Sequence, residues 1–288
     1  MVAVPRLLIV NADDYGLTVG VSRAILRAHA QGIVTSTSVL AVAPGFEPTV
    51  GWLRDTAGIG VGAHLAAVGE DPPLLTAREI PTLVDRKGRL PMSWRRFLPR
   101  MAGGRIDPDD LRREFRAQLH RLEGAGLTLA HVDTHQHLHL WPGVAAVVLG
   151  LARETGIPAV RVTRSSARSG VGQVVRRLSA RLERSARDQG LWFTADATGL
   201  DEAGTLDRPR MLAALDRLGA SGAPSAELGT HPGEAGDPDL DRYRWGYRWP
   251  DELAALTAAE VRSAVDQAGF VLGTYDDLAG RHARGQIA

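Results

Sequence analysis

Short apolar runs alternate along the chain with stretches whose apolar residues recur at helical spacing. The apolar runs are rich in β-branched residues, are short enough for buried strands, and cover residues 6–11, 34–41, 59–64, 127–135, 158–163, 224–231 and 270–278. The stretches with helical spacing cover residues 19–31, 107–123, 143–156, 171–190 and 258–269. Strands that alternate with helices in this way form a parallel sheet, either open or closed into a barrel.

The segment 107–123 shows the helical signal most clearly. Asp107 can cap the first turn, Pro108 suits the first helical position, and Gly124 follows the last turn. An apolar stripe runs along one side and consists of Leu111, Phe115, Leu119 and Leu122. We therefore expect an amphipathic helix that packs against the sheet.

Two longer segments, residues 66–105 and 232–250, carry no regular pattern. Loops of this length in a compact domain usually serve function or lack order. The second loop holds aromatic residues that either line a sugar-binding cleft or anchor the loop by packing, namely Tyr243, Trp245, Tyr247 and Trp249. No low-complexity linker or internal repeat divides the sequence. We predict one domain over residues 1–288, with both loops shaping the substrate cleft.

Composition narrows the classes of function. The chain has 288 residues, 44% of them hydrophobic, and a formal net charge of +1, which gives no bulk electrostatic basis for binding nucleic acid or a membrane surface. It contains no cysteine, so thiolate metal ligands, cysteine nucleophiles and disulfides are excluded. The N-terminal segment lacks the features of a signal peptide, and no apolar stretch approaches the roughly 18 residues of a membrane span. We expect a cytoplasmic protein.

Reactive side chains stand at the ends of several predicted strands. Asp13 and Asp14 follow the first strand, His64 ends the third, and His135 and His231 end two later ones. In parallel β/α folds the C-terminal ends of the strands meet at one mouth, where active sites form. Because side chains alternate along a regular strand, the adjacent aspartates can divide two roles at a strand end, one as a metal ligand and one as a free base.

The segment HVDTHQHLHL holds four of the nine histidines in the chain. If the whole segment is a strand, His131 and His139 lie roughly 26 Å apart, which is too far to share one ion with ligand bonds near 2 Å. Because active sites form at the C-terminal ends of the strands, His135 and His137 are the favoured metal ligands of this segment. We expect His131 to be buried and hydrogen-bonded, His139 to support a ligand or line the cleft, and Asp133 to orient a ligand histidine.

Two imidazoles and one carboxylate leave open positions on a bound metal, as catalysis requires. The metal would acidify a water molecule and polarise a carbonyl, while Asp13 takes the proton of the water and His231 protonates the leaving group. Such a set suits hydrolysis of an amide or an ester. The sequence has no P-loop, no glycine-rich dinucleotide turn and no plausible Ser-His-Asp arrangement.

The chain resembles the YdjC-like (ChbG-type) carbohydrate deacetylases. The resemblance covers residues 6 to about 277 and rests on five segments in the family's order, LLIVNADDYGLT, GIVTSTSVL, GVGAHL, HVDTHQHLHLWP and THPG. It implies an α/β fold of the TIM-barrel type, a deformed β/α barrel. It also implies hydrolysis of the N-acetyl groups of small amino sugars, such as acetylated chito-oligosaccharides, with the help of one divalent metal ion.

The same motifs imply roles for individual residues. The metal ligands would be Asp14, His64 and His135, the catalytic base Asp13, and the general acid His231. The supporting residues would be Arg161 and Arg164, which orient the base or the substrate, together with Asp133 and His137. The ion stays open between zinc, which two imidazoles favour, and magnesium, with which the family is often described.

Two other interpretations remain at this stage. One is a metal-dependent hydrolase of another class, such as a phosphoesterase, although such enzymes usually gather more carboxylates and often two metals. The other is a non-catalytic module that binds a sugar or a metal. The expected partner is a small acetylated sugar, and a homodimer is left open. The loop 66–105 is less recognisable than the other segments, so the particular sugar is not predicted.

Overall fold

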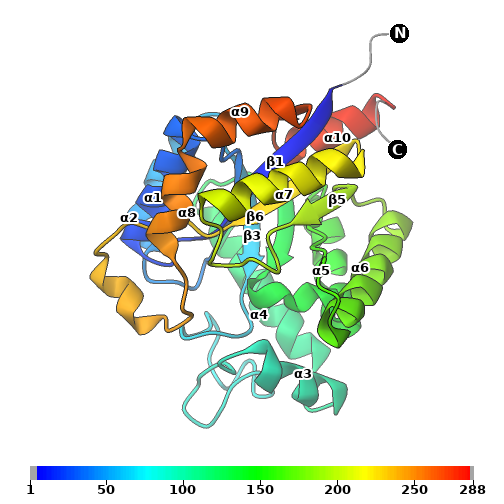
Figure 1. Ribbon diagram of the computed structural model, residues 1–288. Helices are drawn as coiled ribbons and strands as arrows, with labels where there is room; N and C mark the ends of the chain where they lie inside the picture. Colours follow the sequence, from blue (N-terminus) through cyan, green and yellow to red (C-terminus); the bar gives the residue numbers. More distant parts are fainter. Residues whose placement is uncertain (1–4, 286–288) are drawn as a thin grey trace.

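The computed structural model describes residues 5–285 and arranges them around one curved parallel sheet (Figure 1). The strands are β1 (Arg6–Tyr15), β2 (Ser36–Val39), β3 (Gly60–Leu65), β4 (His131–Thr134), β5 (Asp196–Thr198), β6 (Ser225–Thr230) and β7 (Phe270–Leu272). Their order is β4-β3-β2-β1-β6-β5, with β7 also paired to β1, and every pairing is parallel. The C-terminal ends of the strands therefore point to the same side of the molecule.

Helices pack around this sheet (Figure 1). They are α1 (Val19–Gln31), α2 (Phe46–Arg54), α3 (Trp94–Ala102), α4 (Pro108–Gly124), α5 (Pro142–Thr155), α6 (Gly170–Asp188), α7 (Arg208–Ser221), α8 (Trp249–Leu256), α9 (Ala259–Gln267) and α10 (Tyr275–Ala283), with two short 3-10 segments, η1 (His135–Leu140) and η2 (Pro238–Arg242). Between β4 and β5 the sheet continues only as isolated bridges, from Val132 to Val160 and from Ala159 to Trp192. The fold is thus the predicted deformed β/α barrel, formed by a single α/β domain.

The strongest sequence signals are confirmed. Helix α1 has the predicted bounds, and α4 begins after Asp107, whose side chain accepts a hydrogen bond from the Asp109 backbone. The apolar stripe of α4 is fully buried because it faces the core. Helices α5, α6 and α9 lie within one or two residues of the predicted segments.

The predicted strand at 127–135 is confirmed only in its second half, because residues 127–130 are not strand and β4 begins at His131. Strand β4 ends at Thr134, and η1 begins at His135. Gln136 and His137 have φ angles of 54° and 52°, which turn the chain and end the strand. Only His131 of the four histidines lies on β4, so the spacing calculated for a fully extended segment does not apply.

Other expectations also change. The predicted strand 270–278 stops at Leu272 because Thr274 and Asp277 form a capping box that starts α10. Residues 158–163 form bridges only. The two irregular segments contain α3 and η2. The pattern analysis also missed four elements, α2, α7, α8 and β5.

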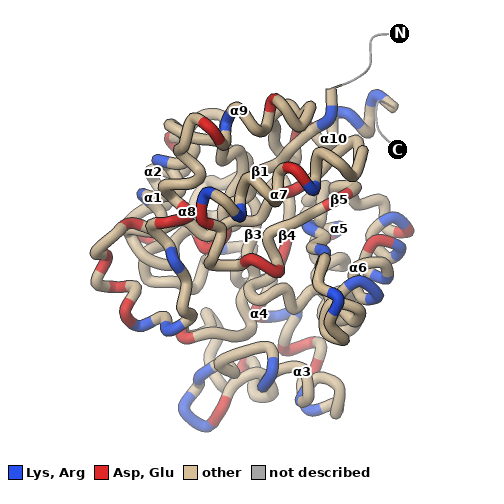
Figure 2. Tube along the Cα trace, in the orientation of Figure 1, with Lys and Arg blue, Asp and Glu red and all other residues tan. Residues whose placement is uncertain are grey.

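Charge is distributed in agreement with the composition. Figure 2 shows basic and acidic residues interspersed over most helices and loops. Among the described residues, no helix is long and apolar enough to cross a membrane.

Candidate active site

The end of β1 brings both adjacent aspartates into one cleft. The pairing of β1 with β2 shifts register between Ala12 and Tyr15, and Asp14 has a φ of 68°. This bulge breaks the alternation of side chains, so Asp13 and Asp14 both line a cavity of about 390 Å³. The histidines that share this lining are His64, His135, His137 and His231. Residues from distant parts of the sequence thus meet where the strands end.

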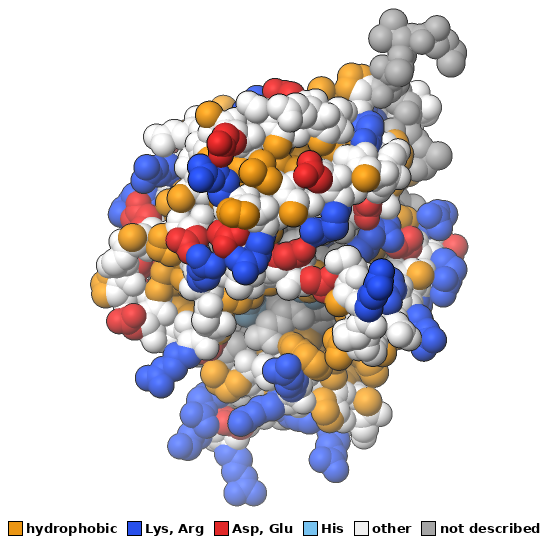
Figure 3. All heavy atoms as spheres, viewed as in Figure 1, with side chains coloured by type: hydrophobic (Ala, Val, Ile, Leu, Met, Phe, Trp, Pro, Cys, Tyr) orange, Lys and Arg blue, Asp and Glu red, His pale blue; other side chains and the backbone are white. Residues whose placement is uncertain are grey.

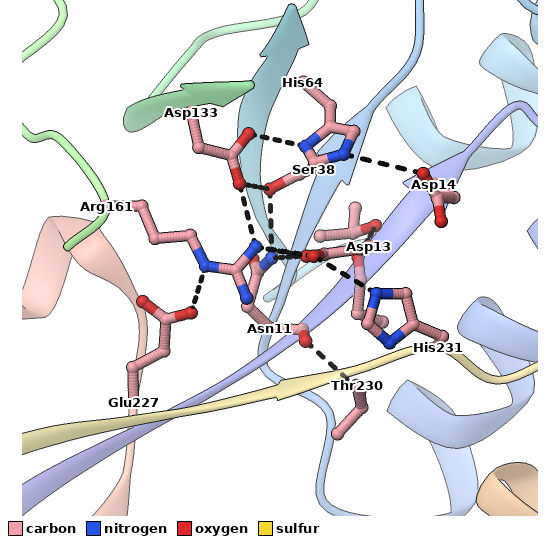
Figure 4. A network of polar contacts seen from close by, with 12 residues as sticks. Asn11, Asp13, Asp14, Ser38, His64, Asp133, Arg161, Glu227, Thr230 and His231 are labelled. Carbon is pink, nitrogen blue, oxygen red and sulfur yellow. Dashed lines mark hydrogen bonds and ion pairs between the residues drawn. The ribbon is translucent and has the colours of Figure 1, made fainter. Parts of the chain in front are cut away.

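Arg161 fixes the Asp13 carboxylate. Its Nη1 donates to Oδ1 and Oδ2 of Asp13 at 2.5 and 2.7 Å, and to Oδ2 of Asp133 at 2.9 Å (Figure 4). Its Nε forms an ion pair with Glu227. Burial alone would raise the pKa of Asp13, but the Arg161 guanidinium, with His64 and His231, holds it at about 2. Asp13 is therefore ionised throughout the neutral range.

Asp133 orients His64. Nδ1 of His64 lies 2.7 Å from Oδ1 of Asp133, so the opposite ring nitrogen, Nε2, faces Oδ1 of Asp14 at 3.5 Å (Figure 4). Nδ1 of His135 approaches the same Asp14 oxygen at 3.2 Å. Against the effect of burial, the Asp133 carboxylate raises the pKa of His64 to about 9. A buried histidine held in this way by a carboxylate is a common arrangement for metal ligands.

Asp14, His64 and His135 fit a metal ion. Bonds of about 2 Å in a tetrahedral site place ligand atoms about 3.3 Å apart, close to the observed 3.2 and 3.5 Å. Oδ1 of Asp14 is buried and accepts no hydrogen bond from the described residues, although it lies between the two imidazoles. A buried polar atom without a hydrogen bond requires an explanation, and a cation would supply one.

A second group of possible ligands fits less well. Asp13, His64 and Asp133 also bring one ligand atom each within 4.8 Å of one another. However, Nη1 of Arg161 already binds both of these carboxylates, and Nδ1 of His64 is bound to Asp133. A metal there would have to displace the guanidinium. The described residues therefore favour one ion, on the side of Asp14.

His231 lies beside Asp13 on the opposite side of the cleft from His64. Its Nε2 is 3.6 Å from Oδ2 of Asp13 (Figure 4). Its backbone N–H donates to Oε2 of Glu252 at 2.6 Å, and the ring of Tyr247 packs edge-on against its imidazole. Burial lowers the pKa of His231, and this effect exceeds the opposing influence of Asp13 and Asp14. The imidazole is thus neutral when it faces the ionised Asp13.

Sequence reasoning missed several residues of this network. Asn11 Nδ2 donates to Oδ1 of Asp13 at 2.7 Å and to Oγ of Ser38 at 2.9 Å, and Ser38 in turn donates to Asp133 at 3.1 Å. Asn11 precedes Asp13 by two positions on the same strand, and that spacing could have identified it. Glu227 gave no comparable signal, because it lies alone in an apolar segment, and Glu252 lies next to Asp251 in the segment GYRWPDEL, to which the sequence assigned no role.

The remaining candidates take different positions. His131 is buried, stacks on Tyr275 and lies 3.0 Å from Oγ of Ser38. His139 is buried between Thr134 and the carbonyl of Arg161, so it supports η1 instead of lining the cleft. His137 lines the cleft, and its role in supporting a ligand or contacting the substrate stays a prediction.

Arg164 does not reach the cleft. It forms an ion pair with Glu183 of α6 at 2.6 Å and donates to the carbonyl of Ala195 at 2.8 Å. The Arg164 side chain points toward α6 and β5, whereas that of Arg161 points into the polar centre. The predicted role of Arg164 in orienting the base or substrate is therefore corrected.

The aromatic loop packs internally and also borders the cleft. Trp245 lies 5.2 Å from the ring of His135, while Tyr247 contacts His231, and both line the cavity. Two hydrogen bonds hold the loop in place. Tyr243 donates to Asp71 at 3.0 Å, and Trp245 donates to Glu70 at 3.0 Å. The loop is thus anchored by packing, and two of its aromatic rings also line the cavity, while its role in binding a sugar stays a prediction.

Several known proteins are similar to this chain in sequence or in fold. A family model described as YdjC-like protein matches residues 7–267. The carbohydrate deacetylase of Brevibacillus brevis is 30% identical over 94% of this chain and 99% of its own length, and a chitooligosaccharide deacetylase of Klebsiella pneumoniae is 34% identical over 95% and 99%. A crystal structure from Enterococcus faecalis V583, named as a candidate cellobiose-phosphate cleavage protein, has a TM-score of 0.80 at 25% identity and covers 96% of this chain and 99% of its own.

Proposed function

Because this chain belongs to the YdjC-like protein family, we propose that it is a metal-dependent carbohydrate deacetylase. Its reaction would be hydrolysis of the N-acetyl group of an amino sugar, or of a glycoconjugate that carries one. The names of the carbohydrate and chitooligosaccharide deacetylases that match nearly the full chain support this activity. The name of the E. faecalis protein refers to a different substrate, a cellobiose phosphate, so the substrate of this chain has to be argued from the site.

One observation carries the proposal, namely the different surroundings of the two adjacent aspartates. Asp14 faces two imidazoles at the spacing of metal ligands. Asp13 instead binds Arg161 and lies beside His231. A purely binding protein would not need an ionised carboxylate next to a neutral histidine, whereas amide hydrolysis needs a base and an acid.

Asp14, His64 and His135 would hold the ion. When bound, it would lower the pKa of a water molecule and polarise the amide carbonyl. Two imidazoles and one carboxylate favour zinc or another transition ion over magnesium on the basis of ligand softness. Asp133 would keep Nδ1 of His64 occupied so that Nε2 stays directed at the ion.

Asp13 and His231 would move the proton. Asp13 is ionised and accepts a proton from the attacking water at a carboxylate oxygen. Since the pKa of Asp13 is held near 2, the proton passes readily to the neutral His231, whose Nε2 is 3.6 Å away. His231 then donates it to the amide nitrogen as the C–N bond breaks, which yields acetate and the free amine. A base this weak would work only on an acidified water, which is a further reason for a metal.

The other hydrolase class is not favoured. Phosphoesterases commonly use two metals about 3.5–4 Å apart. Here the second group of candidate ligands shares His64 with the first and is occupied by Arg161. The described residues therefore offer one ion site, which suits acyl transfer to water better than a two-metal displacement.

The direct test is release of acetate from N-acetylglucosamine and N,N′-diacetylchitobiose, with metal added and with chelator. We expect release that the chelator abolishes and that zinc or magnesium restores. In Asp13→Asn, metal binding should persist while turnover falls by about 10²–10⁴-fold, because only the base is removed. Asp14→Asn should lose metal binding itself. If the metal-loaded protein released no acetate from any amino sugar, the proposed function would be wrong.

A further inference from the structure

An apolar groove continues from the catalytic cleft. Its cavity of about 340 Å³ lies between the start of α6, the segment η1 and helix α3. The groove and the cleft share four lining residues, Trp94, Gln136, His137 and Leu200. A molecule whose acetamido group lies at Asp13 and Asp14 can therefore extend into the groove without crossing a barrier of other residues.

The walls of the groove are hydrophobic and partly open to solvent. Val174 and Val171 of α6 are 50% and 65% exposed, and Trp94 across the groove is 38% exposed. Further apolar lining comes from Leu98, Leu138, Leu140, Trp141, Val175 and Leu178. Figure 3 shows a central hollow on this face, with hydrophobic side chains gathered along one side of it. A contiguous exposed apolar surface next to a catalytic cleft is typical of a ligand-binding groove.

Most polar side chains of the groove are already engaged, apart from Nδ1 of His137, which is buried and has no hydrogen-bond partner among the described residues. Ser165 donates to Asp201 at 2.7 Å, and the Asp201 carboxylate also accepts from the backbone of Ser166 at 2.7 Å. Oε1 of Gln136 accepts from the backbone of Trp94 at 2.9 Å. Ser169 caps α6 by accepting from Gly172 at 3.1 Å. A further sugar unit would need free donors and acceptors for its hydroxyls, and these residues offer few.

We propose that the substrate is an N-acetylated amino sugar with an apolar aglycone, and that the aglycone lies in this groove. This inference rests on the proposed function and specifies the class of its substrate. The aglycone would be an alkyl or aryl chain linked to the sugar at the junction formed by Trp94 and His137. The acetamido group would stay in the polar part of the cleft, where the charged residues lie.

The proposal is tested with a graded series of substrates. Methyl, hexyl and octyl N-acetyl-β-glucosaminides are compared with N,N′-diacetylchitobiose, all below the concentration at which micelles form. We expect kcat/KM to rise with chain length, by up to about fourfold for each methylene that becomes fully buried. Rates that are equal for methyl and octyl glycosides, or a preference for diacetylchitobiose, would overturn the proposal.

A pair of variants on α6 links the effect to the groove. Val174→Asp places a charge in the apolar wall, whereas Gln173→Asp places the same charge on the neighbouring exposed position outside the lining. Val174→Asp should lower the octyl-to-methyl ratio of kcat/KM by at least tenfold, and Gln173→Asp should leave it unchanged. A ratio that both variants change equally would mean that charge on α6 acts from a distance, and the groove assignment would be wrong.

Binding without turnover separates this inference from the proposed function. Octyl β-glucoside has no acetamido group, so it can bind but cannot react. We expect it to change the tryptophan fluorescence of the wild type, and methyl β-glucoside to have no effect. Binding of octyl glucoside without deacetylation of any substrate would contradict the function but keep the groove. If the chain instead forms a dimer that Val174→Asp dissociates, and octyl glucoside does not bind, a second copy occupies the groove and the proposal fails.

Discussion

Arg161 is the cation on which the polar centre depends. It is buried and contacts three carboxylates that come from three different strands, Asp13, Asp133 and Glu227. Buried charges are tolerated when they are paired, and removal of one partner leaves the others without compensation. The side chain thus determines both the position of Asp13 and the stability of the surrounding strands.

Arg161→Met should be strongly destabilising. It removes the cation shared by three buried carboxylates, so we expect a loss of about 3–5 kcal/mol in the free energy of unfolding, measured by urea denaturation. The control is Arg164→Met, because Arg164 forms its ion pair at a partly exposed position and should contribute about 0–1 kcal/mol. Equal losses in the two variants would contradict the central role of Arg161.

Glu252 predicts a pH dependence of stability. Burial raises its pKa to about 8, although it accepts hydrogen bonds from the backbone of His231 and Leu206. The folded state therefore holds this proton above the pH at which the unfolded chain, with a pKa near 4.5, releases it. The stability associated with the protonated form is complete below about pH 4.5 and is lost as the pH rises to about 8.

The measurement compares wild type with Glu252→Gln between pH 5 and 8. Their difference in free energy of unfolding should change by up to about 1.4 kcal/mol per pH unit, with the wild type losing stability as the pH rises. Glu123→Gln, at an exposed position of α4, should show no such slope relative to the wild type. A flat difference for Glu252→Gln would mean that this carboxyl is ionised in the folded protein.

At the scale of elements, periodicity identified the helices better than the short strands. Helices such as α1 and α4 carry repeated apolar positions and a capping residue, so their bounds could be predicted. Strand β4 has only four residues, and the left-handed residues Gln136 and His137 that follow it have no glycine to mark the turn. Non-glycine residues in this conformation are held by tertiary contacts and often occur at functional sites, which is why pattern analysis extended the strand too far.

Thr18, which precedes α1, links this helix to Asp237, the residue before η2. Oγ1 of Thr18 accepts from the backbone of Val21 at 3.0 Å and donates to Oδ2 of Asp237 at 2.6 Å. Thr18→Val keeps the shape of the side chain but removes both hydrogen bonds. We therefore expect a loss of about 1–2 kcal/mol in the free energy of unfolding, measured by thermal and urea denaturation. Thr18→Ser retains the hydroxyl and should lose little. If Thr18→Val were as stable as the wild type, the hydrogen bonds of the Thr18 hydroxyl would not contribute to stability and the prediction would be wrong.

At the scale of the whole molecule, metal binding should stabilise the fold. The proposed ion binds the folded chain only, so a concentration 100-fold above its Kd raises the free energy of unfolding by about 2.7 kcal/mol. We expect zinc to raise the melting temperature of the chelator-treated protein. Asp14→Asn should remove this increase, whereas Asp216→Asn on the exposed face of α7 should keep it. An increase that survives in Asp14→Asn would place the ion elsewhere.

The whole-molecule architecture could be predicted because alternating strands and helices allow few arrangements, and the strand-end rule brought Asp13, Asp14, His64, His135 and His231 to one mouth. What could not be predicted depends on contacts between distant residues. The bulge that turns Asp14, and the pairing of Arg161 with Glu227, form only when several strands are in place. Arg164 was misplaced for the same reason, since a motif match gives no direction for a side chain in a segment without regular pairing.

The central position of β1 has a consequence for synthesis of the chain. Its partner β2 follows within a few tens of residues, but Leu7 pairs with Ser225, and Arg6 with Phe270, near the other end of the sequence. At about 5–20 residues per second, a ribosome takes about 10–50 s to make the intervening chain. During that time one edge of an apolar strand stays open to other nascent chains. The segment that is most prone to aggregation is therefore synthesised first. The yield of the protein in a cell should depend on chaperones that cover this segment until β6 and β7 have been made.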